Sequence, residues 1–341
     1  MIALAFIAAI GALAPNKDTQ ARTRFEAYGP PSRTTEMMHR LLSPLTARLL
    51  DAQAKTPGEG LREQSIDLAR EQFALHVPAK PPADGYALLV FVSPWPQANV
   101  PAAWVPVLDR HGMIFVSADR SGNDADLLDR REPLALLAAY NVMQKYPVDP
   151  HRVFIGGFSG GSRVALRLAL GYPDLFRGAL LMAGSDPVGT AAIPLPPAPL
   201  FRLFRQASRL VYLTGEQDAD HLAMDERSRA SLRDWCVAGA TSAPAPWTGH
   251  QLPPPEALDR ALSLLAQAAP EDTPRLADCR ANVDRKLAAQ LDKVRRLAAE
   301  GRFAEARTQL LGIDARYGGL AAPQSVSMEA SLPPPARSAT H

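Results

Sequence analysis

A serine placed between glycines is the residue of this sequence best suited to chemistry. Gly157, Ser159 and Gly161 match the pattern G-x-S-x-G, which places a serine at a sharp turn between a strand and a helix. The glycines let the strand and the helix approach without a Cβ clash, while the serine takes a strained backbone conformation. The free N–H groups of the helix then face the hydroxyl, which suits a developing oxyanion. The pattern predicts that Ser159 is a nucleophile.

A nucleophilic serine needs an acid and a base. A histidine must take the hydroxyl proton, and a carboxylate must orient that histidine. In chains with this turn the residues follow in the order serine, acid, histidine. Asp218 lies just past an apolar run at residues 210–213 and is the expected acid. Glu216 and Asp220 compete with it, and the alternative is a solvated acidic loop without a chemical role.

The expected base is His250. It lies downstream of the acid, in a glycine-flanked loop before a helical pattern at residues 256–266. His221 is too close in sequence to Asp218 to approach that carboxylate from a different loop. Four more histidines precede the serine and break the expected order: His39, His76, His111 and His151.

Strands and helices alternate around these residues. Apolar runs typical of buried strands occupy residues 86–92, 113–116, 153–158, 177–183 and 210–213. Helical patterns lie at residues 101–110, 133–145, 162–170 and 256–266. The alternation predicts an α/β fold with a mostly parallel sheet and helices on both faces. Ligands of such sheets bind at the carboxyl ends of the strands, from which all three candidate residues come.

Three segments resemble the α/β-hydrolase superfamily: residues 148–161 through the serine turn, 214–218 at the acid and 249–253 at the base. Over about residues 70–268, the sequence is similar to secreted esterases of the polyhydroxybutyrate depolymerase and feruloyl esterase type. The resemblance implies the α/β-hydrolase fold and a triad of Ser159, Asp218 and His250. Such chemistry needs no metal and no organic cofactor.

The loop that should help to bind an oxyanion departs from this family. Family members usually carry His-Gly after the third strand, where a backbone N–H completes the oxyanion hole. This chain has Ser93, Pro94, Trp95 and Pro96 there. Because proline has no N–H, Trp95 is the expected donor of this loop, and Gly160 supplies the other N–H. The alternative is that Trp95 only lines the acyl pocket.

The N-terminal region has its own patterns. The uncharged apolar run at residues 2–14 predicts a signal peptide within residues 1–21, cleaved after Ala14 or Ala21, and hence a periplasmic or secreted protein. A buried helix of a cytoplasmic protein is the alternative. Residues 15–33 are polar and resemble a linker. A helical extension is expected within residues 22–64, with two short helices meeting at Ser43 and Pro44.

Three further segments lie within or after the expected hydrolase domain at residues 65–268. The proline-rich residues 187–207 form either an apolar lid over the site or a surface loop. Residues 269–320 show purely helical spacing, which predicts a helical hairpin. The tail at residues 321–341 is expected to be disordered because of its composition.

Composition limits the kinds of partner. The chain has 341 residues, 47% hydrophobic and 21% charged, with a net charge of +2, so no basic surface for nucleic acid is indicated. The run at residues 2–14 is too short for a stable membrane span. Cys236 and Cys279 form a disulfide or remain two buried thiols, and they lack the neighbouring ligands of a zinc site.

The preferred interpretation is a secreted serine esterase that acts on a small-molecule or polymeric ester through an acyl-enzyme. A serine peptidase would use the same triad. A third reading is a hydrolase-like binding protein, inactivated by its altered oxyanion loop, with the C-terminal hairpin as a partner surface. The sequence specifies neither the substrate nor the oligomeric state.

Overall fold

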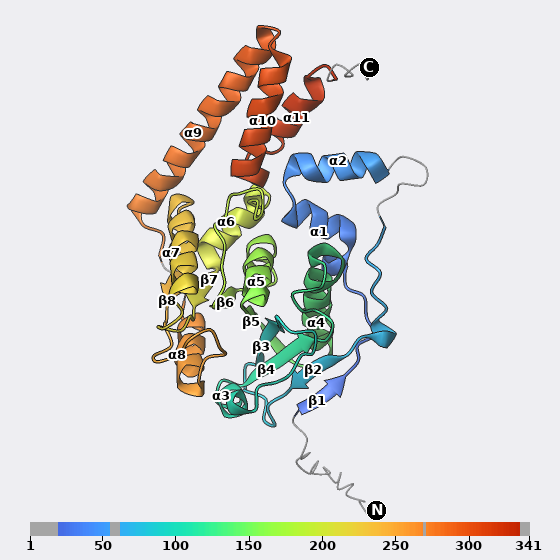
Figure 1. Ribbon diagram of the computed structural model, residues 1–341, viewed down its shortest axis with the longest axis vertical. Coiled ribbons are helices and arrows are strands. Elements are labelled where there is room, and N and C mark those ends of the chain that lie inside the picture. Colours follow the sequence, from blue (N-terminus) through green and yellow to red (C-terminus); the bar gives the residue numbers. More distant parts are fainter. Residues whose placement is uncertain (1–19, 55–61, 269–270, 335–341) are drawn as a thin grey trace, which may run out of the picture.

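A sheet of eight strands forms the centre of the protein (Figure 1). The structure is a computed structural model and describes residues 20–54, 62–268 and 271–334. The strands are β1 (Gln20–Thr23), β2 (Phe73–His76), β3 (Tyr86–Val92), β4 (Met113–Ala118), β5 (Val148–Phe158), β6 (Gly178–Met182), β7 (Arg209–Tyr212) and β8 (Ala240–Ser242). Their order across the sheet is β1-β2-β4-β3-β5-β6-β7-β8.

The sheet is mostly parallel. Strand β2 runs antiparallel to β1 and β4, and the pairings from β4 to β8 are parallel. All residues of β3 and β4 are buried, as their continuous apolar composition predicts for strands covered on both faces. The carboxyl ends of β3, β5 and β7 therefore lie along one edge, where the loops after them can meet.

Helices cover both faces of the sheet. They are α1 (Thr34–Leu41), α2 (Pro44–Ala54), α3 (Val105–Arg110), α4 (Glu132–Lys145), α5 (Gly160–Gly171), α6 (Ala198–Ala207), α7 (Ala219–Asp234), α8 (Pro255–Leu265), α9 (Pro274–Ala299), α10 (Phe303–Tyr317) and α11 (Gln324–Ser331). Leu88 and Val90 of β3 belong to the core under α4 and α5, whereas Leu89 and Phe91 belong to the core under α3 and α8. The predicted two-sided covering is confirmed.

The N-terminal region contributes both a strand and helices. Residues 15–33 were expected to be a linker, but β1 pairs with β2, with Ala21 opposite Leu75. This polar strand lies at the edge of the sheet and has no apolar alternation that would predict it. Helices α1 and α2 meet at Ser43 and Pro44, as the sequence predicts.

Most of the apolar side chains of residues 187–207 pack into the core, and only the start of the segment reaches the site. Helix α6 packs against α5, and its Phe201 and Phe204 are buried in the main core. Leu195 is also buried, and its carbonyl accepts a hydrogen bond of 2.7 Å from the Gly319 N–H. Of the four apolar side chains that suggested a cover for the site, Phe201 and Phe204 therefore face the interior, whereas Leu200 and Leu203 remain partly exposed. Ala192 and Ile193 line a cavity beside Ser159.

The predicted C-terminal hairpin consists of α9 and α10, which extend beyond the sheet at the top of Figure 1. A disulfide joins Cys279 of α9 to Cys236, which follows α7, and so decides between the two alternatives for these cysteines. Tyr317 at the end of α10 packs edge-on against Trp235 at 5.5 Å. These contacts attach the hairpin to the main domain.

The tail differs from the expected disorder between residues 321 and 334. Helix α11 packs against α10 and α2, and Arg48 of α2 pairs with Glu329 at 3.0 Å. Leu332 is buried, and Val326 and Met328 pack on the core. The contacts of these few apolar side chains with the core outweigh the proline-rich composition that suggested disorder. Residues 335–341 lie outside the described residues, as do residues 1–19 of the expected signal peptide.

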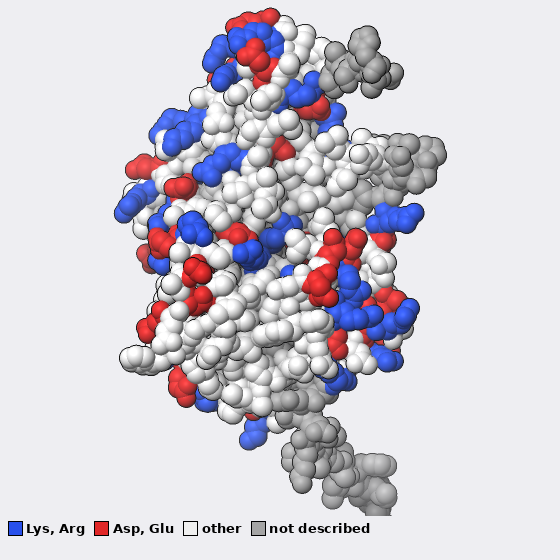
Figure 2. Space-filling view, in the orientation of Figure 1, with Lys and Arg blue, Asp and Glu red and all other residues white. Residues whose placement is uncertain are grey.

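Charges of both signs are interspersed on the face that Figure 2 shows. Lys and Arg side chains alternate with Asp and Glu side chains, and uncharged surface separates the groups. This face therefore has no extended region of one sign. Among the described residues, no helix combines the length and the apolar character that crossing a membrane requires.

Candidate active site

Ser159 occupies the sharp turn that its sequence motif predicts. It lies between β5 and α5 with φ 53° and ψ −121°, a conformation that costs about 1–3 kcal/mol in a residue other than glycine. Its N–H donates to the Met182 carbonyl at 2.8 Å, which fixes the strained residue against β6. A Cβ at Gly157 would overlap the Gly161 backbone, and one at Gly161 would overlap the Val92 carbonyl. Both glycines are therefore required by the close approach of strand and helix.

The loops that carry Asp218 and His250 are joined by backbone hydrogen bonds. Gln217 N–H donates to the Thr248 carbonyl at 3.0 Å, and Glu216 N–H donates to the Ala245 carbonyl at the same distance. Gly215 lies so close to the second loop that a Cβ would overlap the Thr248 carbonyl. These contacts bring the two loops to one edge of the sheet although they are distant in sequence.

Ser159, His250 and Asp218 form a continuous hydrogen-bonded series. His250 Nε2 lies 3.2 Å from Ser159 Oγ, and His250 Nδ1 lies 2.7 Å from Asp218 Oδ2. An ionised carboxylate can only accept, so His250 Nδ1 carries the proton and Nε2 is free to accept one from the serine. Asp218 is 8% exposed, whereas Ser159 is accessible from the cavity that it lines. The structure thus brings the three predicted residues together.

His221 is a member of this group that the sequence reasoning excluded. Its Nδ1 lies 2.8 Å from Asp218 Oδ1, and its ring stacks on His250 with 4.2 Å between centroids. The local approach is possible because Asp218 immediately precedes α7 and His221 lies one turn into that helix. Asp218 and His221 are three residues apart, a spacing that brings side chains together at the start of a helix. Helix α7 was not predicted from the sequence, so this spacing gave no indication of the contact.

The two histidines affect the charge of Asp218. Burial disfavours the ionised carboxylate, but the hydrogen bonds from His221 and His250 outweigh it, so the pKa of Asp218 lies below its ordinary value. The carboxylate is therefore charged over the whole neutral range. A charged Asp218 can orient His250 and stabilise the imidazolium that forms when this histidine takes a proton.

Asp225 is a second buried carboxyl group below this site. It accepts hydrogen bonds of 2.6 Å from Ser185 and Thr214, and the Thr214 hydroxyl in turn accepts from the Ala183 N–H. Burial raises the pKa of Asp225, against the effect of these two donors. The network connects the end of β6 to the acid loop after β7, and so supports the position of Asp218.

The two expected oxyanion donors differ in their availability. Among the described residues, the Gly160 N–H has no acceptor, and Gly160 lines the same cavity as Ser159. The Trp95 N–H instead donates to Ser93 Oγ at 3.0 Å. Its indole stacks on Phe158 at 5.6 Å and is 48% exposed. The prediction for Trp95 thus needs correction, because Ser93 already uses the N–H that was expected to bind the oxyanion.

The cavity beside Ser159 has a volume of about 540 Å³. Its walls come from the loop after β4, from α5, from the segment before α6 and from the start of α7. The lining residues are Asn123, Ala125, Leu127, Arg131, Ser159, Gly160, Arg163, Val164, Arg167, Asp186, Ala192, Ile193 and His221. Polar and apolar groups are mixed, which fits a substrate that has both kinds of surface.

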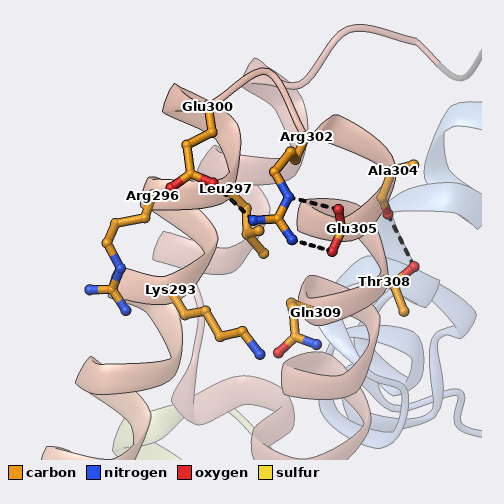
Figure 3. Close-up of a pocket in the computed structure, with 9 residues that line it drawn as sticks. All are labelled: Lys293, Arg296, Leu297, Glu300, Arg302, Ala304, Glu305, Thr308 and Gln309. Carbon is orange, nitrogen blue, oxygen red and sulfur yellow. Dashed lines mark hydrogen bonds and ion pairs between the residues drawn. The ribbon is translucent and has the colours of Figure 1, made fainter.

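A second hollow of about 580 Å³ lies at the turn of the hairpin between α9 and α10 (Figure 3). Arg302 there pairs with Glu300 and Glu305 at 2.9 and 2.6 Å. The Thr308 hydroxyl donates to the Ala304 carbonyl. The nine residues that line this hollow include neither a histidine nor a cysteine. It therefore lacks a histidine base of the kind that lies beside Ser159, although it is the larger of the two hollows.

Among the described residues, Asp218, His221 and His250 also lie close enough together to hold a metal ion. Each offers one ligand atom, and these atoms lie within 4.8 Å of one another. Both histidine Nδ1 atoms, however, are already bonded to the carboxylate. The hydrogen bonds account for the cluster without an ion.

No protein-family model and no curated protein matches this chain. Solved structures with a similar fold include an S-formylglutathione hydrolase from Staphylococcus aureus, at 14% identity, covering 58% of this chain and 93% of that one, with a TM-score of 0.46. A poly(3-hydroxybutyrate) depolymerase from Bordetella parapertussis is 15% identical over 61% of this chain and 88% of its own, with a TM-score of 0.44.

A puromycin-hydrolyzing peptidase from Mycobacterium tuberculosis is also similar, at 17% identity and a TM-score of 0.43. The match covers 74% of this chain and 40% of the peptidase. These identities are too low to transfer an activity. The eight-stranded sheet with its order β1-β2-β4-β3-β5-β6-β7-β8, its antiparallel β2 and its serine turn after β5 gives the chain the α/β-hydrolase fold.

Proposed function

We propose that this protein is a serine hydrolase that cleaves carboxylic esters through an acyl-enzyme. The observation that carries the proposal is the series Ser159 Oγ–His250–Asp218, with distances of 3.2 and 2.7 Å. A positioned base and a charged orienting group are what a serine hydroxyl requires to become a nucleophile at neutral pH. The motif resemblance to secreted esterases favours an ester, either a small molecule or a polymer.

The proposed reaction has two symmetrical halves. Ser159 Oγ attacks the ester carbonyl while His250 Nε2 takes the hydroxyl proton, and the carbonyl oxygen becomes an oxyanion near the Gly160 N–H. The C–O bond to the alcohol then breaks, and His250 returns the proton to the leaving alcohol. In the second half, water gives a proton to His250 and attacks the acyl carbonyl. The C–O bond to Ser159 then breaks, His250 returns the proton to Ser159 Oγ, and the acid is released.

Labelling with a fluorophosphonate tests the nucleophile directly. Wild-type protein should be labelled covalently, and Ser159→Ala should not. Ser162→Ala is the matched control, because Ser162 lies on the same helix but is fully buried. It should label like the wild type. Wild-type protein that resists the probe would favour the third reading, a hydrolase-like binding protein.

Ester and peptide cleavage can be separated with matched substrates. For 4-nitrophenyl esters and 4-nitroanilides of the same acyl groups, we expect kcat/KM to be higher for the esters after correction for the uncatalysed rates. A preference for the anilides would support a serine peptidase with the same triad. A series of acyl lengths then measures what the cavity of about 540 Å³ accepts.

We also propose that the protein is exported. The Cys236–Cys279 disulfide supports this, because such bonds persist mainly in oxidising compartments. Cleavage after Ala14 fits better than cleavage after Ala21, since Gln20 and Ala21 pair with β2 and would be removed from the sheet. Mass spectrometry of the N-terminus in periplasmic and culture fractions tests both points. Uncleaved protein confined to the cytoplasm would contradict export.

A further inference from the structure

The site around Ser159 has one available backbone donor for an oxyanion. Gly160 lines the cavity beside Ser159, and its N–H has no acceptor among the described residues. The loop after β3 has two prolines without N–H, and its Trp95 N–H already donates to Ser93 Oγ. The tetrahedral intermediate of ester cleavage carries a full negative charge on its oxygen, and each missing donor lowers the rate by a large factor. A second donor must therefore come from another part of the cavity.

The side chain of Asn123 lies directly against Gly160. A Cβ at Gly160 would overlap Asn123 Oδ1, and it would lie 2.8 Å from Cγ and 3.1 Å from Nδ2. Asn123, Ser159 and Gly160 line the same cavity. Any side chain at position 160 would displace the carboxamide, so the glycine after the nucleophile gives Asn123 its place.

The loop that carries Asn123 is fixed to the proline-containing loop. The Asn123 N–H donates to the Pro94 carbonyl at 3.0 Å, and the Arg120 N–H donates to the Pro96 carbonyl at 2.6 Å. The buried guanidinium of Arg131 donates to the carbonyls of Ser93 and Ser121, at 3.2 and 3.0 Å. The backbone of Asn123 is thus held in place before any substrate arrives, as an effective oxyanion donor requires.

We propose that the Asn123 carboxamide is the second oxyanion donor of this site, alongside the Gly160 N–H. The proposal rests on the serine hydrolase function proposed above. Asn123 is exposed, and within the described residues its carboxamide makes no hydrogen bond, so the carboxamide can turn its Nδ2 end, rather than the Oδ1 end that lies nearer Gly160, toward an oxyanion. A negatively charged oxygen selects the Nδ2 end, because only that end donates.

The donor role can be measured with Asn123→Ala. With a 4-nitrophenyl ester, kcat should fall about 10²–10³-fold, the loss typical of one oxyanion donor, while KM changes little. The inhibition constant of an aryl trifluoromethyl ketone, whose adduct carries the same oxyanion, should rise in parallel with the loss of kcat. Asn99→Ala is the control: Asn99 is an exposed residue outside the cavity that accepts from Arg22, and this change should leave kcat as it is.

Gly160→Ala gives an independent test. Its methyl group would displace the Asn123 carboxamide but leave the residue 160 N–H in place, so kcat should fall as in Asn123→Ala. The double variant Asn123→Ala, Gly160→Ala should lose no more than either single variant, because both remove the same donor. Additive losses would overturn the proposal.

The results separate this proposal from the function on which it rests. If wild-type protein is labelled and hydrolyses esters but Asn123→Ala stays within twofold of it, Asn123 is not a donor and the serine hydrolase proposal stands. If wild-type protein neither labels nor hydrolyses, both proposals fall. Unfolding midpoints of all variants should match the wild type, since the exposed carboxamide makes no bond within the fold.

Discussion

The proposed chemistry depends at the residue scale on one carboxylate with two histidines. Asp218 accepts from His250 through Oδ2 and from His221 through Oδ1, so each oxygen has a fixed donor. The His250 ring also contacts two other rings: that of His221, stacked with 4.2 Å between centroids, and that of Phe158, tilted with 4.9 Å between centroids. These contacts restrict the base and can align it with Ser159 before substrate binds.

The lowered pKa of Asp218 predicts that the difference in stability between the wild type and Asp218→Asn depends on pH. Because the folded-state pKa lies below the ordinary value of 3.8, folding favours the ionised form. This stabilisation is fully present above pH 3.8 and is lost as the pH falls through the folded-state pKa. At pH 7, the free energy of unfolding of Asp218→Asn should therefore be about 1.5 kcal/mol lower than that of the wild type, the scale of a hydrogen bond to a charged group.

Urea unfolding of both proteins between pH 7 and pH 3 measures this difference. The two curves should converge as the pH falls below 3.8. A constant difference across the range would mean that the ionisation of Asp218 is not coupled to folding. In the same samples, ester hydrolysis by Asp218→Asn should fall about 10⁴-fold, because the asparagine favours the wrong tautomer of His250.

At the scale of elements, the disulfide closes the segment that contains the base. Cys236 follows α7 and Cys279 lies on α9, so the 43-residue separation spans β8, the His250 loop and α8. Cys236 itself is buried with a φ of 62°. The crosslink thus has two effects. It connects the hairpin to the main domain, and it restricts the conformations of the His250 loop in the unfolded chain.

Removal of this crosslink should destabilise the protein more than it impairs the site. For a loop of this length the chain-entropy relation gives about 4 kcal/mol, so Cys236→Ala, Cys279→Ala should unfold at a clearly lower urea concentration. Labelling of Ser159 at 25 °C should persist, because the loops around it are joined by their own backbone bonds. Wild-type protein treated with a reductant is the control and should match the double variant. A loss below 1 kcal/mol would refute the predicted contribution.

At the scale of the whole molecule, the C-terminal hairpin contacts the segment that forms one wall of the cavity beside Ser159. The N–H of Gly319, which follows α10, donates a hydrogen bond to the Leu195 carbonyl. Ala192 and Ile193, which precede Leu195 in the chain, line the cavity beside Ser159. Arg316 also donates to the Gly189 carbonyl at 3.4 Å. The hairpin therefore helps to shape the site although none of the cavity-lining residues comes from it.

Gly319→Ala tests this connection. Its Cβ would overlap the backbone of Pro196 and Pro197, so the variant should lose about 1–3 kcal/mol and show a raised KM for bulky esters. Gly312→Ala is the matched control, because no atom lies within 4 Å of its Cβ position in α10. It should gain about 0.5–1 kcal/mol from helix propensity and keep its KM. Equal KM values in all three proteins would show that the hairpin does not act on the cavity.

The sequence determined the features that depend on local pattern. The motif around Ser159 predicts a strained turn because the glycines and the flanking periodicities are local, and the alternation of apolar strands and helices predicts the sheet. Asp218 and His250 follow from chain order and from their positions after strand ends. Segments without such periodicity, such as β1 and α11, were not predicted, since their stability comes from contacts with distant elements.

Only the tertiary structure decided which polar groups face one another. The sequence excluded His221 as the base, and the structure agrees in placing His250 at Ser159, but it also shows His221 bonded to Asp218, which the sequence did not predict. The Trp95 N–H, expected to bind the oxyanion, donates to Ser93 Oγ instead. The sequence carried no sign that Asn123 lies against Gly160, because that contact joins loops after different strands. Local sequence periodicity specifies elements, whereas donors and acceptors are paired by the packing of loops that are distant in the chain.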